Sequence, residues 1–289
     1  MSVSVWLRLG RVSNLPTVWS NVLAGLALVG ALTPGLTTLV LMLAMSIFYV
    51  GGMYLNDAFD RNIDRVQRQS RPIPSGQVSA ATVFTLGFVA LAAGTALLVL
   101  TARASGASPT RALASGLALS AFIVLYDAYH KQNPVSPLTM AACRVMIYVA
   151  VGFAVRQELV PAVLLGIVCL LNYLVGLTYA AKQEAFNRLP RLWPLACLGL
   201  PVLIGAALAR EHASVWPFLL LLCGWVVYAL SFLRQGPRRA VPQAVVRLIA
   251  GISLLDAVLI AFAGSSGWAL VAASFCLLTR VFQRFIPGT

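Results

Sequence analysis

Acidic residues are scarce in this chain. Only 8 of its 289 residues are Asp or Glu, against 21 Lys and Arg, while 60% of the residues are apolar and 10% are charged. This composition lies outside the range of soluble domains and predicts an integral membrane protein. Long polar stretches and low-complexity tracts are also missing, which excludes a separate soluble domain, so we expect one domain over residues 1–289.

The patterns of several common sites are absent as well. The sequence has no Walker loop, no HExxH motif and no nucleophile elbow. Its cysteines stand singly within apolar segments, so we interpret them as packing residues rather than metal ligands or disulfide partners. They are Cys143, Cys169, Cys197, Cys223 and Cys276.

Long continuous apolar runs favour membrane-spanning helices over a β-barrel. Bounded by Pro, Gly or charged residues, ten ranges are candidate spans: about 13–31, 36–57, 80–101, 111–128, 136–155, 160–182, 190–209, 215–233, 243–263 and 266–286. The last two are the least certain as separate crossings. The predicted fold class is therefore an all-α polytopic bundle of about nine (eight to ten) transmembrane helices.

The basic residues are distributed unevenly between the two ends of these spans. Of the 21 Lys and Arg, 16 fall on one side, 4 fall on the other, and Arg144 lies within a span. The positive-inside rule makes the basic side cytoplasmic. The net charge of +13 thus reflects topology and attraction to anionic lipid headgroups, and we expect no nucleic-acid partner. We predict a multi-pass protein of the bacterial inner membrane.

Asn56, Asp60 and Asp64 recur every four residues at the cytoplasmic end of the second span. If the helix continues past the membrane, they share one face, where two carboxylates and an amide suit Mg²⁺ completed by substrate phosphates. The alternative is a helix-end ladder of salt bridges with i,i+4 pairs such as Asp57 and Arg61. Exposed pairs of that kind contribute at most ~1 kcal/mol, which favours the metal–diphosphate site.

The sequence NDAFDRNID followed by SRPIPSGQVS resembles the first aspartate-rich motif and adjoining loop of UbiA-type intramembrane prenyltransferases. That family has the pattern N-x-x-x-D-x-x-x-D and then R-P-I/L-P-S-G. The segment LYDAYHKQNP and the helix after it also resemble the family, with a Tyr, a Lys in the loop and an Arg in the next helix. The resemblance implies helices around a central cavity, with Mg²⁺ held against an isoprenoid diphosphate by two acidic motifs.

Carried over to this chain, the resemblance gives Asn56, Asp60 and Asp64 as metal ligands, with the two aspartates catalytic. It makes the basic side chains near the motif candidate contacts of the diphosphate. These are Arg61, Arg71, Lys131 and Arg144. The implied chemistry is ionisation of an allylic diphosphate, followed by prenylation of an acceptor.

The second acidic motif of the family is altered here. Where a D-x-x-x-D arrangement is usual, this chain has LTYAAKQEAFNRLPR, with Glu184 as the only acid and Lys182 two residues before it. We interpret Lys182 as a replacement for the missing cation, with Glu184 orienting Lys131 or keeping a weak metal contact. Interface residues at a helix end are the alternative. The segment resembles that of the EboC-like branch of the superfamily.

Ionisable residues inside spans usually face a cavity or a partner. Arg144 is predicted to face the cavity. Asp256, near the middle of a span, must face protein, water or an arginine such as Arg247. Asp127 and His130 fit either a general base or metal neighbour, or an ion pair with Lys131.

The leading hypothesis is Mg²⁺-dependent transfer of a prenyl group to an unidentified aromatic or lipid acceptor within the membrane. Because the second motif is depleted, a diverged scaffold that binds a lipid or isoprenoid without turnover is the alternative. A small transporter with Asp256 as the coupling acid is a third possibility. It would call for internal repeats and paired broken helices, which the sequence lacks.

Overall fold

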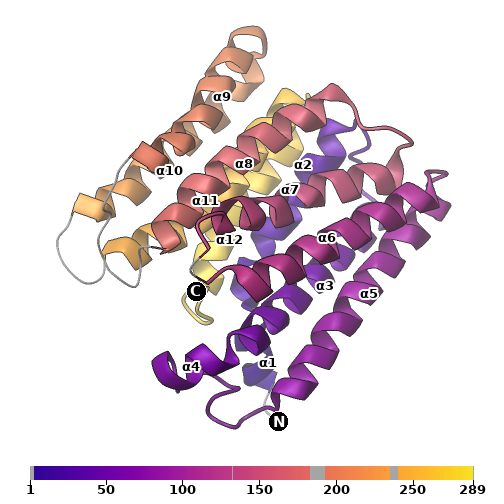
Figure 1. Cartoon of the computed structure of the whole chain (residues 1–289). Helices are drawn as coiled ribbons and strands as arrows, with labels where there is room; N and C mark the ends of the chain where they lie inside the picture. Colours follow the sequence, from indigo (N-terminus) through magenta and orange to yellow (C-terminus); the bar gives the residue numbers. More distant parts are fainter. Residues whose placement is uncertain (1–2, 132, 183–192, 235–239, 289) are drawn as a thin grey trace.

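The structure is a computed structural model that describes residues 3–131, 133–182, 193–234 and 240–288. In these ranges all regular secondary structure is helical, which confirms the all-α prediction (Figure 1). The elements are α1 (Val3–Leu9), η1 (Val12–Asn14), α2 (Leu15–Leu28), α3 (Leu36–Phe59), α4 (Arg61–Gln67), α5 (Ala80–Ala104), α6 (Pro109–Tyr129), α7 (Ser136–Val155), α8 (Pro161–Lys182), η3 (Trp193–Leu198), α9 (Gly199–Glu211), η4 (Ala213–Val215), α10 (Trp216–Ser231), η5 (Phe232–Arg234), α11 (Ala240–Phe262) and α12 (Ser266–Phe282).

Each of the ten predicted spans overlaps a helix, although the described part of the range 190–209 begins at Trp193 and consists of η3 and α9. Among the described residues, 7 helices are long and apolar enough to cross a membrane, namely α3, α5, α6, α7, α8, α10 with η4, and α11. The remaining predicted ranges contain the shorter helices α2, α9 and α12. A total of about nine crossings therefore stays a prediction.

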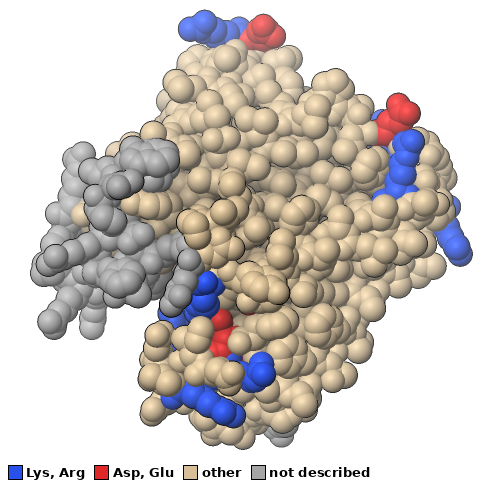
Figure 2. Space-filling view, in the orientation of Figure 1, with Lys and Arg blue, Asp and Glu red and all other residues tan. Residues whose placement is uncertain are grey.

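The outer surface of the bundle is apolar. Large side chains such as Leu36, Leu164 and Leu203 are exposed, and Figure 2 shows charged residues gathered at the margins of a broad uncharged face. Helix α11 differs, because 78% of its most apolar stretch is buried. It packs against α2, α8, α10 and α12 and forms the centre of that half of the bundle.

Helices α3 and α5 approach each other closely through glycines. A Cβ atom on Gly51 would lie 2.8 Å from Cβ of Ala90, and one on Gly87 would lie 2.7 Å from the side chain of Leu55. In a membrane the hydrophobic effect does not drive helices together, so close packing has to do so. Small residues permit this close approach of two helices. This packing holds the end of α3, which carries the acidic motif, against the start of α5.

The motif end of α3 is supported by a small apolar cluster. Val5 and Leu9 of α1 pack with Ala58 of α3, Val78 and Val83. Ser79 caps α5 by accepting a hydrogen bond from the backbone nitrogen of Thr82 at 3.1 Å. These contacts fix the end of the loop between α4 and α5 at the start of α5.

Candidate functional site

The acidic motif lies where α3 passes into α4. The chain bends at Asp60, between the two helices, but the i→i−4 hydrogen bonds continue: Asp60 N donates to the Asn56 carbonyl at 3.0 Å, and Asp64 N to the Asp60 carbonyl at 2.9 Å. Asn56, Asp60 and Asp64 therefore share one face, as predicted. All three are buried, with exposed fractions of 6%, 4% and 2%.

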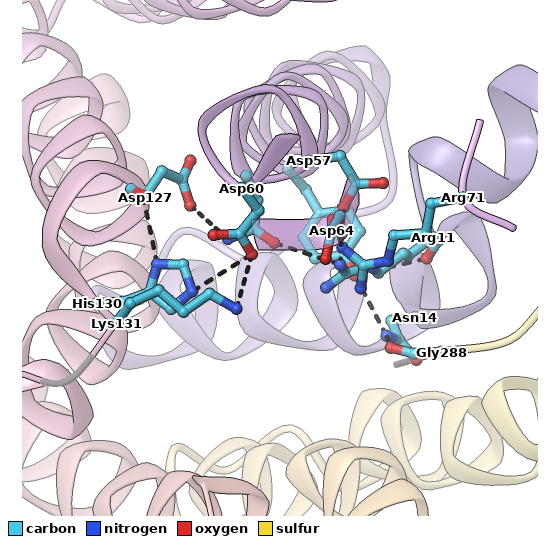
Figure 3. Close-up of polar contacts among 12 residues, drawn as sticks. Arg11, Asn14, Asp57, Asp60, Asp64, Arg71, Asp127, His130, Lys131 and Gly288 are labelled. Atoms are coloured by element: carbon cyan, nitrogen blue, oxygen red, sulfur yellow. Dashed lines mark hydrogen bonds and ion pairs between the residues drawn. The ribbon is translucent and has the colours of Figure 1, made fainter. Parts of the chain in front are cut away.

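Asp60 faces the end of α6. Lys131 Nζ lies 3.0 Å from Asp60 Oδ2, and His130 Nε2 lies 3.6 Å from the same oxygen (Figure 3). Burial alone raises the pKa of Asp60, but the hydrogen bonds and charges of His130 and Lys131 outweigh it and leave the pKa below its ordinary value. The structure thus brings Lys131 to the motif and keeps Asp60 ionised.

Arg71 joins two carboxylates of the motif. Its Nη1 donates to Asp64 Oδ2 at 2.7 Å and to Asp57 Oδ1 at 3.0 Å. These contacts place a predicted diphosphate contact within the motif. They also replace the i,i+4 ladder considered for Asp57: Arg61 turns away, donates to the Ala58 carbonyl at 3.0 Å and lies over the ring of Phe84.

Arg11 also contacts the motif. In the sequence it was only one of the 16 basic residues that indicate the cytoplasmic side. Its Nη2 lies 3.1 Å from Asp57 Oδ1 and 3.3 Å from Asn56 Oδ1. Burial lowers the pKa of Arg11, but the combined electrostatic interactions with Asp57, Tyr49, Tyr126 and Asp127 outweigh burial and raise the pKa above the ordinary value. The backbone of Arg11 is left-handed, with φ of 42°, which is uncommon for a residue other than glycine and occurs often at functional sites.

Asp127 connects the motif to the interior. Asn56 Nδ2 donates to Asp127 Oδ1 at 3.0 Å, whereas Oδ2 is buried and has no hydrogen-bond partner in the described part of the chain. His130 bonds the carbonyls of Tyr126 and Asp127, and Lys131 bonds Asp60, so the alternative ion pair of Asp127 with Lys131 does not form.

An apolar pocket lies between α3, α6 and α7. Asp127 and Tyr126 lie at the end next to the motif, and Arg144 lies in the wall, as predicted. The other lining residues are Met45, Phe48, Tyr49, Gly52, Met53, Leu119, Ile123, Met140, Cys143 and Ile147. Asp127, which lines the pocket, is hydrogen-bonded to Asn56, so the pocket adjoins the motif.

Asp256 faces protein, but the arginine suggested for it is elsewhere. Its carboxylate accepts hydrogen bonds from Ser20, Asn21 and Tyr148. Arg247 instead donates to the Gln243 carbonyl at 2.8 Å, and its guanidinium lies over the rings of Tyr228 and Phe232. Of the alternatives considered for Asp256, the structure shows protein partners and not Arg247, because α11 directs the two side chains to different neighbours.

The altered second motif falls at the edge of the described structure. Lys182 is the last residue of α8, and Glu184 lies outside the described residues. Their roles stay predictions.

The motif fits a metal ion whose coordination shell is completed by oxygen atoms of the substrate. Among the described residues no group of three His, Cys, Asp or Glu side chains could hold a metal ion alone. The contacts of Asp60 and Asp64 described above use one carboxylate oxygen of each. Mg²⁺ is commonly bound by one or two carboxylates, waters and phosphate oxygens.

Comparison with known proteins identifies the family. The sequence model of the UbiA prenyltransferase family matches residues 18–189, more than half of the chain. This chain belongs to the UbiA prenyltransferase family. Its apolar helices and this membership together make it an integral membrane protein. The assignment to the EboC-like branch stays a prediction.

Curated relatives of this UbiA-family chain include digeranylgeranylglyceryl phosphate synthases. The one from Methanopyrus kandleri is 29% identical over 262 residues, which cover 86% of this chain and 87% of that protein. The one from Methanoculleus marisnigri is 32% identical over 136 residues, but this match spans only 46% of that relative and 47% of this chain.

Solved structures support the UbiA fold. A digeranylgeranylglyceryl phosphate synthase structure superposes with a TM-score of 0.63 and 20% identity, over 91% of this chain and 97% of that one. A UbiA homologue from Archaeoglobus fulgidus bound to DMAPP and Mg²⁺ gives a TM-score of 0.53 and 14% identity, over 97% and 96% of the two chains. At these identities the likeness establishes the fold.

Proposed function

We propose that this protein is a membrane prenyltransferase, which transfers a prenyl group from an isoprenoid diphosphate to an acceptor in a Mg²⁺-dependent reaction. The observation that carries the proposal is a cluster of carboxylates and basic groups that is joined to an apolar pocket through the hydrogen bond of Asn56 to Asp127. The Archaeoglobus fulgidus homologues bound to DMAPP or GPP together with Mg²⁺ support this choice of ligands.

The motif divides the work of binding between two kinds of side chain. Asn56, Asp60 and Asp64 would hold Mg²⁺, which would supply positive charge to neutralise the diphosphate. Arg11 and Arg71 contact carboxylates of the motif and present N–H groups to diphosphate oxygens. Lys131, which is 43% exposed, supplies a further positive charge from the end of α6.

The pocket accommodates the prenyl tail and excludes water from the reacting carbon. In the reaction the allylic C–O bond breaks and its electron pair leaves with the diphosphate. The acceptor nucleophile forms the new bond to the same carbon, and its proton passes to the released diphosphate. The basic side chains stabilise the leaving group, since fixed positive groups in a site of low dielectric act more strongly than in water.

The relatives favour a lipid acceptor over an aromatic one, because the name digeranylgeranylglyceryl phosphate synthase describes a lipid phosphate product. The motif opens on the side that carries most Lys and Arg, which we assign to the cytoplasm. The relatives are archaeal, so the bacterial inner membrane stays a prediction.

The proposal is tested by product analysis. Membranes with and without the protein are supplied with isotope-labelled geranyl and geranylgeranyl diphosphate, and lipid extracts are compared by mass spectrometry. We expect a new prenylated species that requires Mg²⁺. This product should disappear in the double variant that carries Asp60→Asn and Asp64→Asn. It should persist in Arg65→Gln, which removes an exposed charge on α4.

The same experiment addresses the diverged scaffold. A labelled diphosphate that binds the wild-type protein, raises its thermal midpoint and gives no new product over a broad set of membrane extracts would contradict turnover. It would support lipid or isoprenoid binding alone. Loss of both binding and product in the doubly substituted protein supports the transferase.

A further inference from the structure

A buried polar network joins α2, α7 and α11 behind the apolar pocket. The carboxylate of Asp256, with no exposed surface, accepts from Ser20 Oγ at 2.5 Å, from Asn21 Nδ2 at 3.1 and 2.8 Å, and from the Tyr148 hydroxyl. These contacts occupy about four acceptor positions, which is the capacity of a carboxylate. Asp256 therefore has no position left for a ligand.

Asp256 fixes the orientation of the Asn21 amide. Because the Asn21 nitrogen faces the carboxylate, its oxygen must face the opposite way, where it accepts from Arg144 Nη1 at 2.8 Å. Arg144 Nη2 donates to Thr17 Oγ1 at 2.9 Å. A flipped amide would direct its oxygen at the carboxylate and its N–H groups at the guanidinium. The orientation of Asn21, and with it the position of Arg144, thus depends on Asp256.

Arg144 reaches the pocket from the wall formed by α7. Its guanidinium lies 5.5 Å from the centre of the Tyr49 ring, and both side chains line the pocket. The two hydrogen bonds to α2 use one N–H on each terminal nitrogen, and a guanidinium has five. Further N–H groups are thus available for a ligand that lies among apolar side chains.

The chemistry of the ligand follows from the proposed function, on which this inference rests. A prenyl tail is a hydrocarbon and offers no hydrogen-bond acceptor, while the diphosphate lies at the motif. The oxygen that Arg144 binds must then belong to the acceptor substrate. The charge of Arg144 is already balanced by Asp256 across Asn21, which favours a neutral oxygen, such as a hydroxyl, over a second anion.

The same balance affects the donor. A lone guanidinium in the pocket wall would raise the energy of a nearby allylic cation, because two positive charges repel each other strongly in a site of low dielectric. With Asp256 behind it, Arg144 acts more as a hydrogen-bond donor than as a net charge. Asp256 therefore makes a fixed arginine compatible with cationic chemistry.

We propose that Arg144 binds a neutral oxygen of the acceptor within the pocket between α3, α6 and α7, and that Asp256, acting through Asn21, is the residue that positions it. Arg144 is a binding residue for the acceptor, whereas Asp256 and Asn21 touch no substrate.

The test uses two probes that differ in one oxygen, farnesol and the hydrocarbon farnesene, and follows the thermal midpoint of the purified protein. We expect farnesol to raise the midpoint of the wild type more than farnesene does. This preference should vanish in Arg144→Gln and in Asp256→Asn. In the Arg144→Gln background, Asp256→Asn should cause no further loss of preference, because it acts through Arg144.

Two tyrosines give matched variants if Asp256→Asn does not fold. Tyr148→Phe and Tyr173→Phe each remove a fully buried hydroxyl bonded to α11, but Tyr173 donates to the Leu248 carbonyl rather than to Asp256. We expect Tyr148→Phe to weaken the farnesol preference severalfold and Tyr173→Phe to retain it.

Three outcomes overturn the inference: equal shifts with both probes in the wild type, a farnesol preference that survives Arg144→Gln, or the same loss in both tyrosine variants. None of these outcomes depends on turnover. A wild type that prefers farnesol but makes no prenylated product contradicts the proposed transferase and leaves the oxygen site supported.

Discussion

The protein has two carboxylate centres that differ in how their oxygens are used. At the motif, the contacts of Asp60 and Asp64 use one oxygen of each, and the partners are cationic side chains. In the centre of the bundle, both oxygens of Asp256 accept hydrogen bonds from neutral donors. The motif is linked to the apolar pocket through Asn56 and Asp127, whereas Asp256 has no exposed surface.

This difference indicates different functions for the same chemical group. A carboxylate with an unused oxygen beside basic groups suits an ion and a diphosphate that arrive together. A carboxylate of one helix that is saturated by donors from two others stabilises the packing of all three, because an unpaired charge or donor in such a place is costly. Burial alone did not separate the two, since Asp64 and Asp256 are both buried. The hydrogen-bond partners did.

The largest expected effect is on turnover at the motif. Asp64→Asn keeps the size of the side chain but removes a charged ligand, so we predict a loss of about 100-fold or more in the rate of diphosphate release. The thermal midpoint should stay within a few degrees of wild type. A rate near wild type would remove the basis for treating the motif as the reactive centre.

The second effect is on stability at the saturated centre. Asp256→Ala leaves Ser20, Asn21 and Tyr148 without their acceptor and Arg144 without its counter-charge. We predict a loss of about 3 kcal/mol or more in the free energy of unfolding, measured by denaturant titration in mixed micelles. Asp64→Asn should cost less than Asp256→Ala, because the amide keeps the size of the side chain and an oxygen that can accept from Arg71. If the two variants were equally stable, the contrast between the centres would be wrong.

The third prediction compares two arginines of the motif segment. Arg71→Gln removes bonds to Asp57 and Asp64, so the affinity for geranyl diphosphate with Mg²⁺ should fall about tenfold, the equivalent of ~1.4 kcal/mol. Arg61→Gln should change it less than about twofold, because Arg61 contacts Ala58 and Phe84. Equilibrium binding of labelled ligand measures both, and equal losses would contradict the assignment.

The smallest effect concerns pH. The pKa of Asp60 is lowered in the folded protein, so its contribution to stability is present above the pKa of the unfolded chain and is lost as the pH falls through the folded value. The wild-type thermal midpoint should therefore exceed that of Asp60→Asn at pH 7, and the gap should close below about pH 4. A gap that widens in acid would reverse the assigned sign.

The sequence predicted the features that depend on spacing. Apolar length gave a helix at each of the ten ranges, and the four-residue spacing gave the shared face of Asn56, Asp60 and Asp64. The resemblance supplied Arg71, Lys131 and Arg144 as candidates, and the structure places all three at the motif or in the pocket. Such features are local, or are carried by a motif.

Contacts between distant segments were not predictable in this way. Arg11 reaches Asp57 across 46 positions, and Asp256 reaches Asn21 across 235, so each depends on how the helices pack. Sequence proximity suggested Asp57 as a partner of Arg61 and Asp256 as a partner of Arg247. The side chains of both arginines instead point to other neighbours, because of the rotation of their helices. The left-handed backbone of Arg11 also has no signature in the sequence.

The most direct test of the account is the Mg²⁺ dependence of prenyl diphosphate binding. Labelled geranyl diphosphate should bind the wild-type protein at least about tenfold more tightly with Mg²⁺ than with chelator, and Asp64→Asn should lose that difference. Asp256→Asn should retain it, because that carboxylate is saturated. The claim that the motif binds the diphosphate together with Mg²⁺ would be contradicted by equal affinity with and without Mg²⁺. A wild-type dependence on Mg²⁺ in Asp64→Asn would also contradict it.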